Sequence, residues 1–260
     1  CAPLCDAILT GSTWQASTGD SRDTAVTAPR HPGDRHPLRS RAQGILETLE
    51  QSNLFLVPLD DERRWYRYHH LFVDVLRGML QSASQPEQIA GLHGRACDWY
   101  RQKGFVADAV HHALLAGHHE RAAEIVEENA WSMVLHAELG TLKKWIQALP
   151  GDSVSRRPWS CIYYAWALLF GESEAAEVQL AAVEQHLQAG DGTPLQAEMQ
   201  GHIAAMRAWI AYMRGDPDRA VVLSRQALEF WPQMDAAVSS VLMRFVGAGC
   251  VRQNDLPTAA

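Results

Sequence analysis

Histidine is the first residue type in this sequence whose spacing suggests chemistry, because it occurs in adjacent pairs. His111-His112 and His118-His119 would offer imidazole nitrogens to zinc or copper if they converged. No cysteine or carboxylate stands at ligand spacing beside them, and histidine near a helix C-terminus is favoured by the helix dipole alone. We therefore interpret both pairs as helix-end residues and predict no metal site.

The sequence contains no catalytic constellation. It has no glycine-rich Walker loop, no nucleophile elbow and no His-Glu-x-x-His helix. We therefore expect no enzymatic activity and no cofactor in this chain.

Residues 44–80 give the clearest order of structural elements. Helical spacing of leucines over 45–49 is followed by an apolar run over 54–57 that ends at Pro58, which predicts a helix and then a strand. Residues 60–63 predict a turn, and the aromatic run 65–68 predicts a second strand that pairs with the first as an antiparallel hairpin. The apolar positions of 71–80 then predict an amphipathic helix. Helix, two-stranded wing and helix together indicate the end of a winged-helix domain.

The run LEQSNLFLVPLDDERRWYRYHHLFVDVLR, residues 49–77, carries a family resemblance. It resembles the winged-helix segment of the MalT-like, LuxR-type ATP-dependent transcriptional regulators, which are signalling ATPases of the STAND class. Residues 113–117, 120–123, 140–150 and 157–159 resemble the tetratricopeptide-like repeats that follow in that family. The resemblance implies an ATPase core upstream that uses ATP and ADP, a DNA-binding helix-turn-helix downstream, an inducer of unknown nature, either small molecule or protein, and self-association on activation.

The resemblance also points to His69 and His70 as nucleotide-sensing residues. In the STAND class a Met-His-Asp motif at the start of the last winged-helix helix supplies a histidine that reads the ADP phosphates. His69 matches that histidine, whereas Tyr68 replaces the Met and His70 replaces the Asp, so the choice between the two histidines stays open. A helix start offers free backbone donors beside an imidazole, which suits an anion. The alternative is that both histidines only cap the helix and pack under the wing.

Beyond residue 84 the pattern is helical throughout, and one signature recurs. A Gly or Asn at a helix end is followed five residues later by Ala, where glycine accepts a positive φ and alanine allows close helix approach. The spacing of the later copies exceeds the roughly 34 residues of a standard tetratricopeptide unit. The five pairs are Gly104 with Ala109, Gly117 with Ala122, Gly171 with Ala176, Gly215 with Ala220 and Asn254 with Ala259.

Aromatic residues in these repeats form a candidate ligand groove. Trp159, Tyr163 and Trp166 share one face of a predicted helix, and Trp209 with Tyr212 lies in the equivalent helix of the next pair. On a concave repeat surface they would stack on a sugar or a peptide, as the resemblance implies. The alternative is core packing, because the helix at 158–170 is apolar all round.

We predict a mainly α protein in which a winged-helix remnant with a small β-hairpin precedes an α-α superhelix of tetratricopeptide-like repeats. The winged-helix domain spans residues 1–82, with a mobile loop over 10–39, and the repeat region spans 83–260, truncated at its C-terminus. The chain opens at Cys1 without a signal peptide or a membrane-spanning run, so we expect a cytoplasmic piece of a longer protein. Its five cysteines, an odd number without metal-type spacing, also fit a reducing compartment.

Three functions fit these observations. The first is a regulatory and sensor fragment of a LuxR-type STAND activator that couples inducer binding to a nucleotide-dependent switch. The second is direct DNA binding by the wing through Arg63, Arg64 and Arg67, which the formal net charge of −7 and the acidic neighbours disfavour. The third is a ligand-free protein-interaction scaffold of helical repeats.

Overall fold

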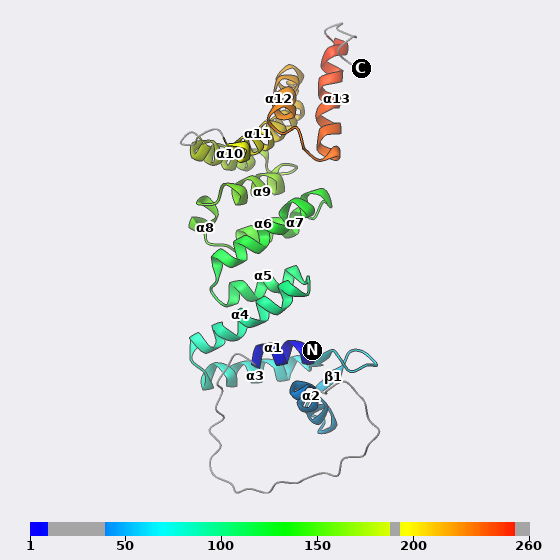
Figure 1. The fold of residues 1–260 in the computed structure, drawn as a ribbon, viewed down its shortest axis with the longest axis vertical. Coiled ribbons are helices and arrows are strands. Elements are labelled where there is room, and N and C mark those ends of the chain that lie inside the picture. The colour runs from blue at the N-terminus through cyan, green and yellow to red at the C-terminus, as the bar shows by residue number, and fades with distance from the viewer. Residues whose placement is uncertain (10–39, 188–192, 253–260) are drawn as a thin grey trace. The chain divides into compact units, whose positions relative to one another are not determined.

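The fold is taken from a computed structural model that describes residues 1–9, 40–187 and 193–252. The chain divides into two compact units, Cys1–His118 and His119–Ala260. The described residues are helical apart from one two-stranded sheet, which confirms the prediction of a mainly α protein with a small hairpin (Figure 1). The predicted loop over 10–39 lies outside the described residues, and the predicted domain boundary at residue 82 stays a prediction.

Unit 1 holds the hairpin and the helices around it. Ser40 caps the first helix after the gap by accepting a hydrogen bond from the Gln43 amide, and Pro86 opens a long helix whose Gln88 side chain accepts from the Gln85 amide. The elements are α1 (Ala2–Leu9), α2 (Arg41–Gln51), β1 (Leu56–Pro58), β2 (Tyr66–Tyr68), α3 (His70–Ala83), α4 (Pro86–Gln102) and α5 (Val106–Leu115).

The wing, defined here as β1, β2 and their connection over 59–65, is an antiparallel hairpin as predicted. Leu56 pairs with Tyr68, and Pro58, at the end of β1, pairs with Tyr66. A small core lies beneath it and consists of buried Ala2, Ala42, Leu46 and Leu56. The short strands are thus held by an apolar cluster drawn from three elements.

Helix α3 is amphipathic as predicted, but much of its apolar face is exposed in the described part of the chain. Leu71, Val75 and Met79 follow one another at helical spacing and are 66%, 56% and 62% exposed. No residue of α3 is buried. The pattern predicted the helix, but the described residues cover only part of its apolar face, where Phe72 lies against Phe55 and Tyr68.

Unit 2 is built of successive helices. Its packed neighbours include α9 with α10, α11 with α12, and α12 with α13. The predicted hairpin of helices around 158–170 and 172–189 is therefore confirmed. The elements are α6 (His119–Leu135), α7 (Leu139–Gln147), α8 (Gly151–Ser155), α9 (Pro158–Leu168), α10 (Ser173–Leu187), α11 (Pro194–Met213), α12 (Pro217–Phe230) and α13 (Ala236–Arg252).

The recurring glycine-alanine signature is confirmed at three of the five sites. Gly104, Gly117 and Gly215 have φ of 78°, 72° and 78°, the left-handed conformation that ends a helix. Each partner alanine, Ala109, Ala122 and Ala220, is 0% exposed, which allows the close helix contact that the signature predicts.

The prediction of positive φ was wrong at Gly171. The amides of Gly171 and Glu172 both donate to the Leu168 carbonyl, at 3.2 and 2.8 Å, so the chain leaves α9 through a right-handed turn. Ala176 is nevertheless 0% exposed. After the end of α6, conversely, Ala137 takes φ of 60°, and no glycine in the sequence predicted a left-handed residue there. Asn254 and Ala259 lie outside the described residues.

Candidate functional site

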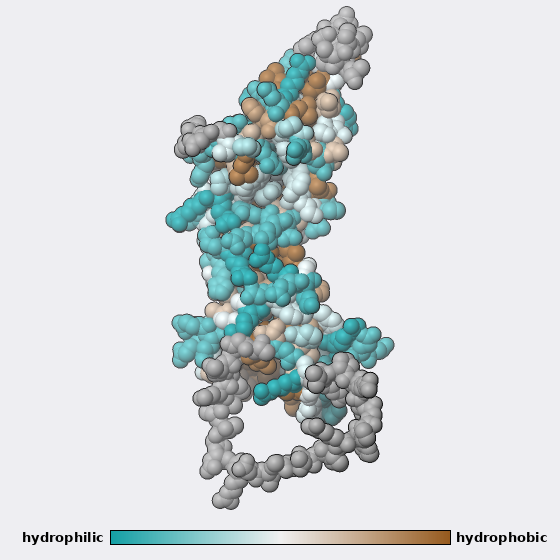
Figure 2. Space-filling view, viewed as in Figure 1, coloured by the Kyte–Doolittle hydropathy of each residue, from teal (hydrophilic) through white to brown (hydrophobic). Residues whose placement is uncertain are grey.

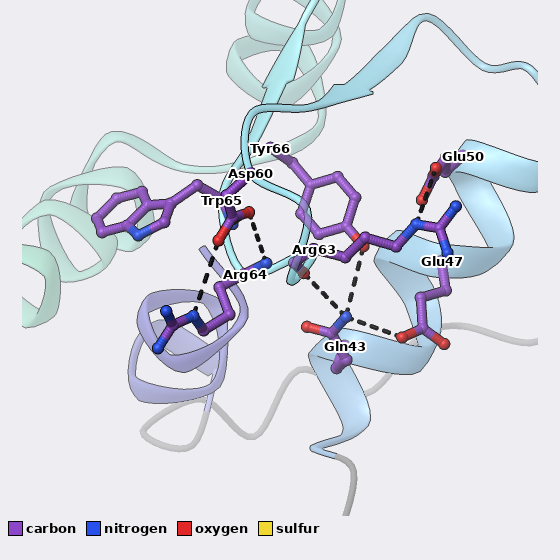
Figure 3. Close-up of polar contacts among 8 residues, drawn as sticks. All are labelled: Gln43, Glu47, Glu50, Asp60, Arg63, Arg64, Trp65 and Tyr66. Atoms are coloured by element: carbon purple, nitrogen blue, oxygen red, sulfur yellow. Dashed lines mark hydrogen bonds and ion pairs between the residues drawn. The ribbon is translucent and has the colours of Figure 1, made fainter.

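The wing is tied to helix α2 by polar contacts (Figure 3). The Gln43 side-chain amide donates to the Glu47 carboxylate at 2.9 Å and to the Arg63 carbonyl at 3.1 Å. It also lies 3.4 Å from the Tyr66 hydroxyl at the start of β2. One α2 side chain therefore fixes both the tip and the second strand of the wing.

The tip of the wing is a tight acidic turn. Asp60 accepts hydrogen bonds at 2.8 Å from the backbone amides of Arg64 and Trp65, and Arg63 takes φ of 52°. This side chain satisfies amides that would otherwise lie unpaired in a turn. The tip is consequently an ordered structure.

Two of the three wing arginines are engaged by acidic residues. Arg63 pairs with Glu50 on α2 at 3.3 Å, and Arg64 lies 3.7 Å from Asp60 (Figure 3). Arg64 also pairs with Glu62. Arg67 is exposed and has no ion pair with a described residue. Neutralised arginines have little charge left for phosphates, so the geometry weighs against the wing as a DNA contact.

A second set of contacts joins the wing to the helices that follow it. Trp65 meets Phe105 edge to face, with ring centroids 6.1 Å apart, and Phe105 is stacked on Trp99 at 6.3 Å. Trp65 therefore lies against Phe105 at the start of α5, while Arg63 points to Glu50 on α2. The wing is held on both sides within unit 1.

The candidate nucleotide-sensing residues stand at the point where β2 passes into α3. The His69 amide donates to the Phe55 carbonyl at 2.8 Å, and the His69 carbonyl accepts from Phe72 and Val73. Both imidazoles are exposed, and their centroids are 4.4 Å apart. Neither packs under the wing as a buried residue, and His69 makes no side-chain capping bond. The two rings thus lie exposed at a helix N-terminus, where an anion is favoured electrostatically.

The histidine pairs outside the wing form no metal site in the described part of the chain. His112 instead contacts His93 of α4, Nδ1 to Nδ1 at 2.8 Å, and its ring is stacked on Tyr100. Burial lowers the pKa of His112 to about 4, with the nearby His93 acting in the same direction. One ring must donate and the other accept, so the pair is neutral and structural.

The predicted aromatic groove falls into two separate clusters. The first, called here the aromatic cage, consists of Trp131, Trp159, Trp166 and Trp231 around His202. Trp166 is buried, whereas Trp159 and its stacking neighbour Tyr163 are partly exposed. The second cluster joins Trp209 to Phe170 at 5.2 Å and to Phe245, on which Tyr212 is stacked at 4.4 Å.

His202 at the centre of the cage was not predicted from the sequence. Its Nδ1 accepts a 3.0 Å hydrogen bond from the Trp166 indole, and its ring is stacked on Trp231 with centroids 3.8 Å apart. Burial lowers the pKa of His202 to about 3, so the ring is neutral with its proton on Nε2. The one available signal was a histidine inside the nearly continuous apolar run of α11.

Cavities in the described part of unit 2 include two that are lined by residues of α11. The larger, of about 370 Å³, is lined by α10, α11 and α12 and includes Arg207, Gln200 and Gln226. A second, of about 260 Å³, is lined by the α9–α10 connection and the end of α11, including Phe170, Trp209 and Arg214. Of the five predicted groove residues, Trp209 alone lines either of these cavities.

Arginine clamps between helices are a further feature that sequence reasoning missed. Arg207 of α11 binds Glu184 through two nitrogens and Glu177 at 3.1 Å. Arg157, just before α9, binds Glu127 through two nitrogens, at 3.1 and 2.7 Å, and Glu120 at 3.1 Å. In both clamps the glutamates stand at i and i+7 on one helix, a spacing that could have predicted a shared face.

Comparison with known proteins finds similar regulators. Residues 1–89 match the family model of the MalT winged helix domain. The chain is 35% identical over 189 residues to the HTH-type transcriptional regulator MalT of Klebsiella pneumoniae (strain 342), and 34% identical over 189 residues to that of Cronobacter sakazakii (strain ATCC BAA-894). Each match covers 72% of this chain and 20% of the relative, so the chain spans about a fifth of the relatives' length. No solved structure matches the chain.

Proposed function

Because this chain is MalT-like, with the MalT winged helix domain over residues 1–89, we propose that it is the regulatory segment of an ATP-dependent transcription regulator. The observation that carries the proposal is the 189-residue match to regulators named HTH-type, which extends well beyond the winged helix. Among the described residues, no helix has the length and apolarity to cross a bilayer.

In this proposal the segment couples two events. Unit 2 binds an inducer, and unit 1 transmits that state to a nucleotide-dependent switch formed with the upstream part of the full-length protein. The wing suits transmission because it is held on one side by Gln43 and Glu50 and on the other by Phe105. A well-anchored element moves as one body with its neighbours.

We assign nucleotide sensing to His69 and His70. Both rings are exposed at the start of a 14-residue helix, in the position from which an imidazole can approach a phosphate. The nucleotide would be bound and hydrolysed by the full-length protein. This chain would supply the histidine contact that distinguishes the nucleotide-bound states of that protein.

The release of a fluorescent ADP analogue from the full-length protein tests the assignment. Loss of a phosphate contact in the His69→Ala, His70→Ala double variant should speed release by about tenfold. His186→Ala on α10, which removes another exposed imidazole, should leave the rate unchanged. Equal release from all three proteins, with nucleotide binding still abolished by substitution of the Walker lysine, would show that the histidines do not sense nucleotide.

Direct DNA binding by this segment is the alternative that a gel-shift addresses. With Arg63 and Arg64 paired to carboxylates, the 260-residue chain should not shift random duplex DNA even at low salt. A shift that disappears in Arg67→Gln would instead assign the contact to the wing.

A further inference from the structure

The cavity at the end of α11 has the size of a site for a small ligand. Its volume is about 260 Å³, below the roughly 300–1,000 Å³ of drug-sized pockets. Its walls come from the α9–α10 connection, with Phe170 and Ser173, and from the last turn of α11, with Trp209, Met213 and Arg214. We call it the Arg214 cavity.

One wall of the Arg214 cavity is aromatic and accessible. Phe170 is 59% exposed, and it meets Trp209 with ring centroids 5.2 Å apart and planes at 74°. Met213, 66% exposed, continues the apolar surface with an adaptable side chain. On the face shown in Figure 2, apolar side chains are grouped around α10 to α13 between hydrophilic ones. Such a wall offers a planar or apolar ligand both ring contact and burial.

The other feature of the Arg214 cavity is an exposed arginine without an acidic partner among the described residues. The Arg214 guanidinium is exposed and has no ion pair or hydrogen bond with a described residue. It also lines an adjoining hollow of about 110 Å³ with Arg219, whose guanidinium likewise has no acidic partner among the described residues. Free guanidinium groups bind carboxylate and phosphate with strong, charge-assisted hydrogen bonds.

The acidic groups around the Arg214 cavity are already engaged. Glu177 is held by Arg207 at 3.1 Å, and Asp216 accepts from the Arg219 backbone amide at 3.1 Å as the cap of α12. Glu172, next to the cavity in sequence, is paired with Lys143. None of these three carboxylates forms an ion pair with Arg214.

The larger 370 Å³ cavity lacks this combination. Its arginine, Arg207, is bound to Glu184 and Glu177 and has no free charge for a ligand. Gln200 and Gln226 offer neutral amides there. The two cavities thus differ in the class of ligand that they favour.

We propose that the Arg214 cavity binds a small organic anion, with its carboxylate or phosphate at Arg214 and its aromatic portion against Trp209 and Phe170. The inference rests on the proposed sensor role of unit 2 and gives the ligand class of that role. Of the five aromatic residues predicted to form the groove, only Trp209 belongs to this proposed binding site.

Ligand-observed NMR and calorimetry of the 260-residue chain test the proposal with defined probes. Phenylacetate and phenyl phosphate should bind the wild-type chain at concentrations up to about 10 mM, and neutral phenylacetamide should bind about tenfold more weakly. Arg214→Gln and Trp209→Leu should each weaken the anionic probes by about tenfold, and Arg214→Lys should recover part of the affinity.

Arg156→Gln is the matched control, since Arg156 is another exposed arginine of unit 2 that lines none of the cavities described above. It should bind the probes as the wild type does, and circular dichroism should show every variant folded. Equal binding of the amide and the acid, equal binding by Arg214→Gln, or no binding by the wild type would overturn the proposal. None of these results would bear on the proposed role in transcription regulation, which is tested separately by measuring transcript levels.

Discussion

At the scale of single residues, the aromatic cage shows how one polar group can organise an apolar core. His202 is 2% exposed, and its Nδ1 accepts a hydrogen bond from Trp166. A buried donor or acceptor without a partner costs about 1–3 kcal/mol, so this bond fixes both the imidazole tautomer and the indole position. The stacked Trp231 then closes one face of the ring.

Neutral His202 makes the stability of unit 2 depend on pH. Burial lowers its folded-state pKa to about 3, whereas a histidine in the unfolded chain has a pKa of about 6.5. The unfolded chain therefore binds more protons between these values, so stability is fully present above pH 6.5 and falls as the pH drops toward 3. From pH 7 to pH 5 the loss should be about 2 kcal/mol.

Denaturant unfolding of the wild type and of His202→Gln at several pH values measures this effect. Glutamine can still accept a hydrogen bond from Trp166 but does not titrate. From pH 7 to pH 5 the free energy of unfolding of the variant should therefore fall by about 2 kcal/mol less than that of the wild type. His112, whose pKa is also lowered, titrates in both proteins and cancels in the comparison. Parallel curves for the two proteins would mean that His202 is not the titrating group.

Gly201 is a second residue whose identity is set by the cage. A Cβ at this position would lie 2.4 Å from the Cβ of Trp231. Gly201→Ala should therefore lower the free energy of unfolding by about 1–3 kcal/mol, because the helix and the indole must move apart. Thermal unfolding followed by circular dichroism checks this.

Gly140→Ala on α7 is the matched substitution, since nothing lies within 4 Å of its added Cβ. It should leave stability unchanged or raise it slightly, because alanine is the better helix former. A Gly201 variant as stable as the Gly140 variant would disprove the close packing of α11 against Trp231.

At the scale of elements, the two arginine clamps repeat one arrangement. In each clamp an arginine binds the second glutamate of an i, i+7 pair with two nitrogens and the first with one. The glutamates lie on α6 or α10, and the arginine lies just before α9 or on α11. The same kind of contact therefore holds α6 to the start of α9 and α10 to α11.

The clamp at Arg207 should contribute measurably to stability. Its side chain is 22% exposed, so removing it would leave two partly buried glutamates without a partner. Arg207→Ala should lower the free energy of unfolding by about 1–3 kcal/mol, less than the 3–5 kcal/mol of a fully buried pair. A double-mutant cycle with Glu184→Gln isolates the pairwise part.

Arg77→Ala provides the comparison for an exposed ion pair. Arg77 and Asp74 on α3 are 73% and 80% exposed and 3.8 Å apart, and such pairs contribute little. We expect no measurable change in that variant. If the coupling energy between Glu184 and Arg207 is also too small to measure, the clamp has no structural role.

Local patterns predicted the elements better than they predicted the contacts between them. The hairpin and the glycine turns at 104, 117 and 215 follow from backbone preferences of nearby residues, which a sequence displays directly. The cage around His202 joins residues from α6, α9, α11 and the end of α12. Contacts between residues so far apart in the sequence cannot be predicted from a local pattern. The same holds for the Arg214 cavity, because whether Arg214 has an acidic partner depends on the tertiary fold.

At the scale of the whole molecule, the chain has a well-anchored wing in unit 1 and a candidate ligand cavity in unit 2. The residues 49–77 predicted the winged helix because their order of helix, strand, turn, strand and helix is continuous in the sequence. The same pattern predicted an apolar face on α3, but not that Leu71, Val75 and Met79 on it are more than half exposed. Nucleotide sensing at His69 and His70 stays a prediction for the full-length protein.

RNA sequencing of cells with altered alleles of the gene that encodes this chain tests the central claim most directly. Deletion of the gene should change a defined set of transcripts, and the His69→Ala, His70→Ala allele should change the same set, because both interrupt control by the segment. The His186→Ala allele should match the wild type. Unchanged transcript levels in the deletion strain would contradict a role for this chain in transcription regulation.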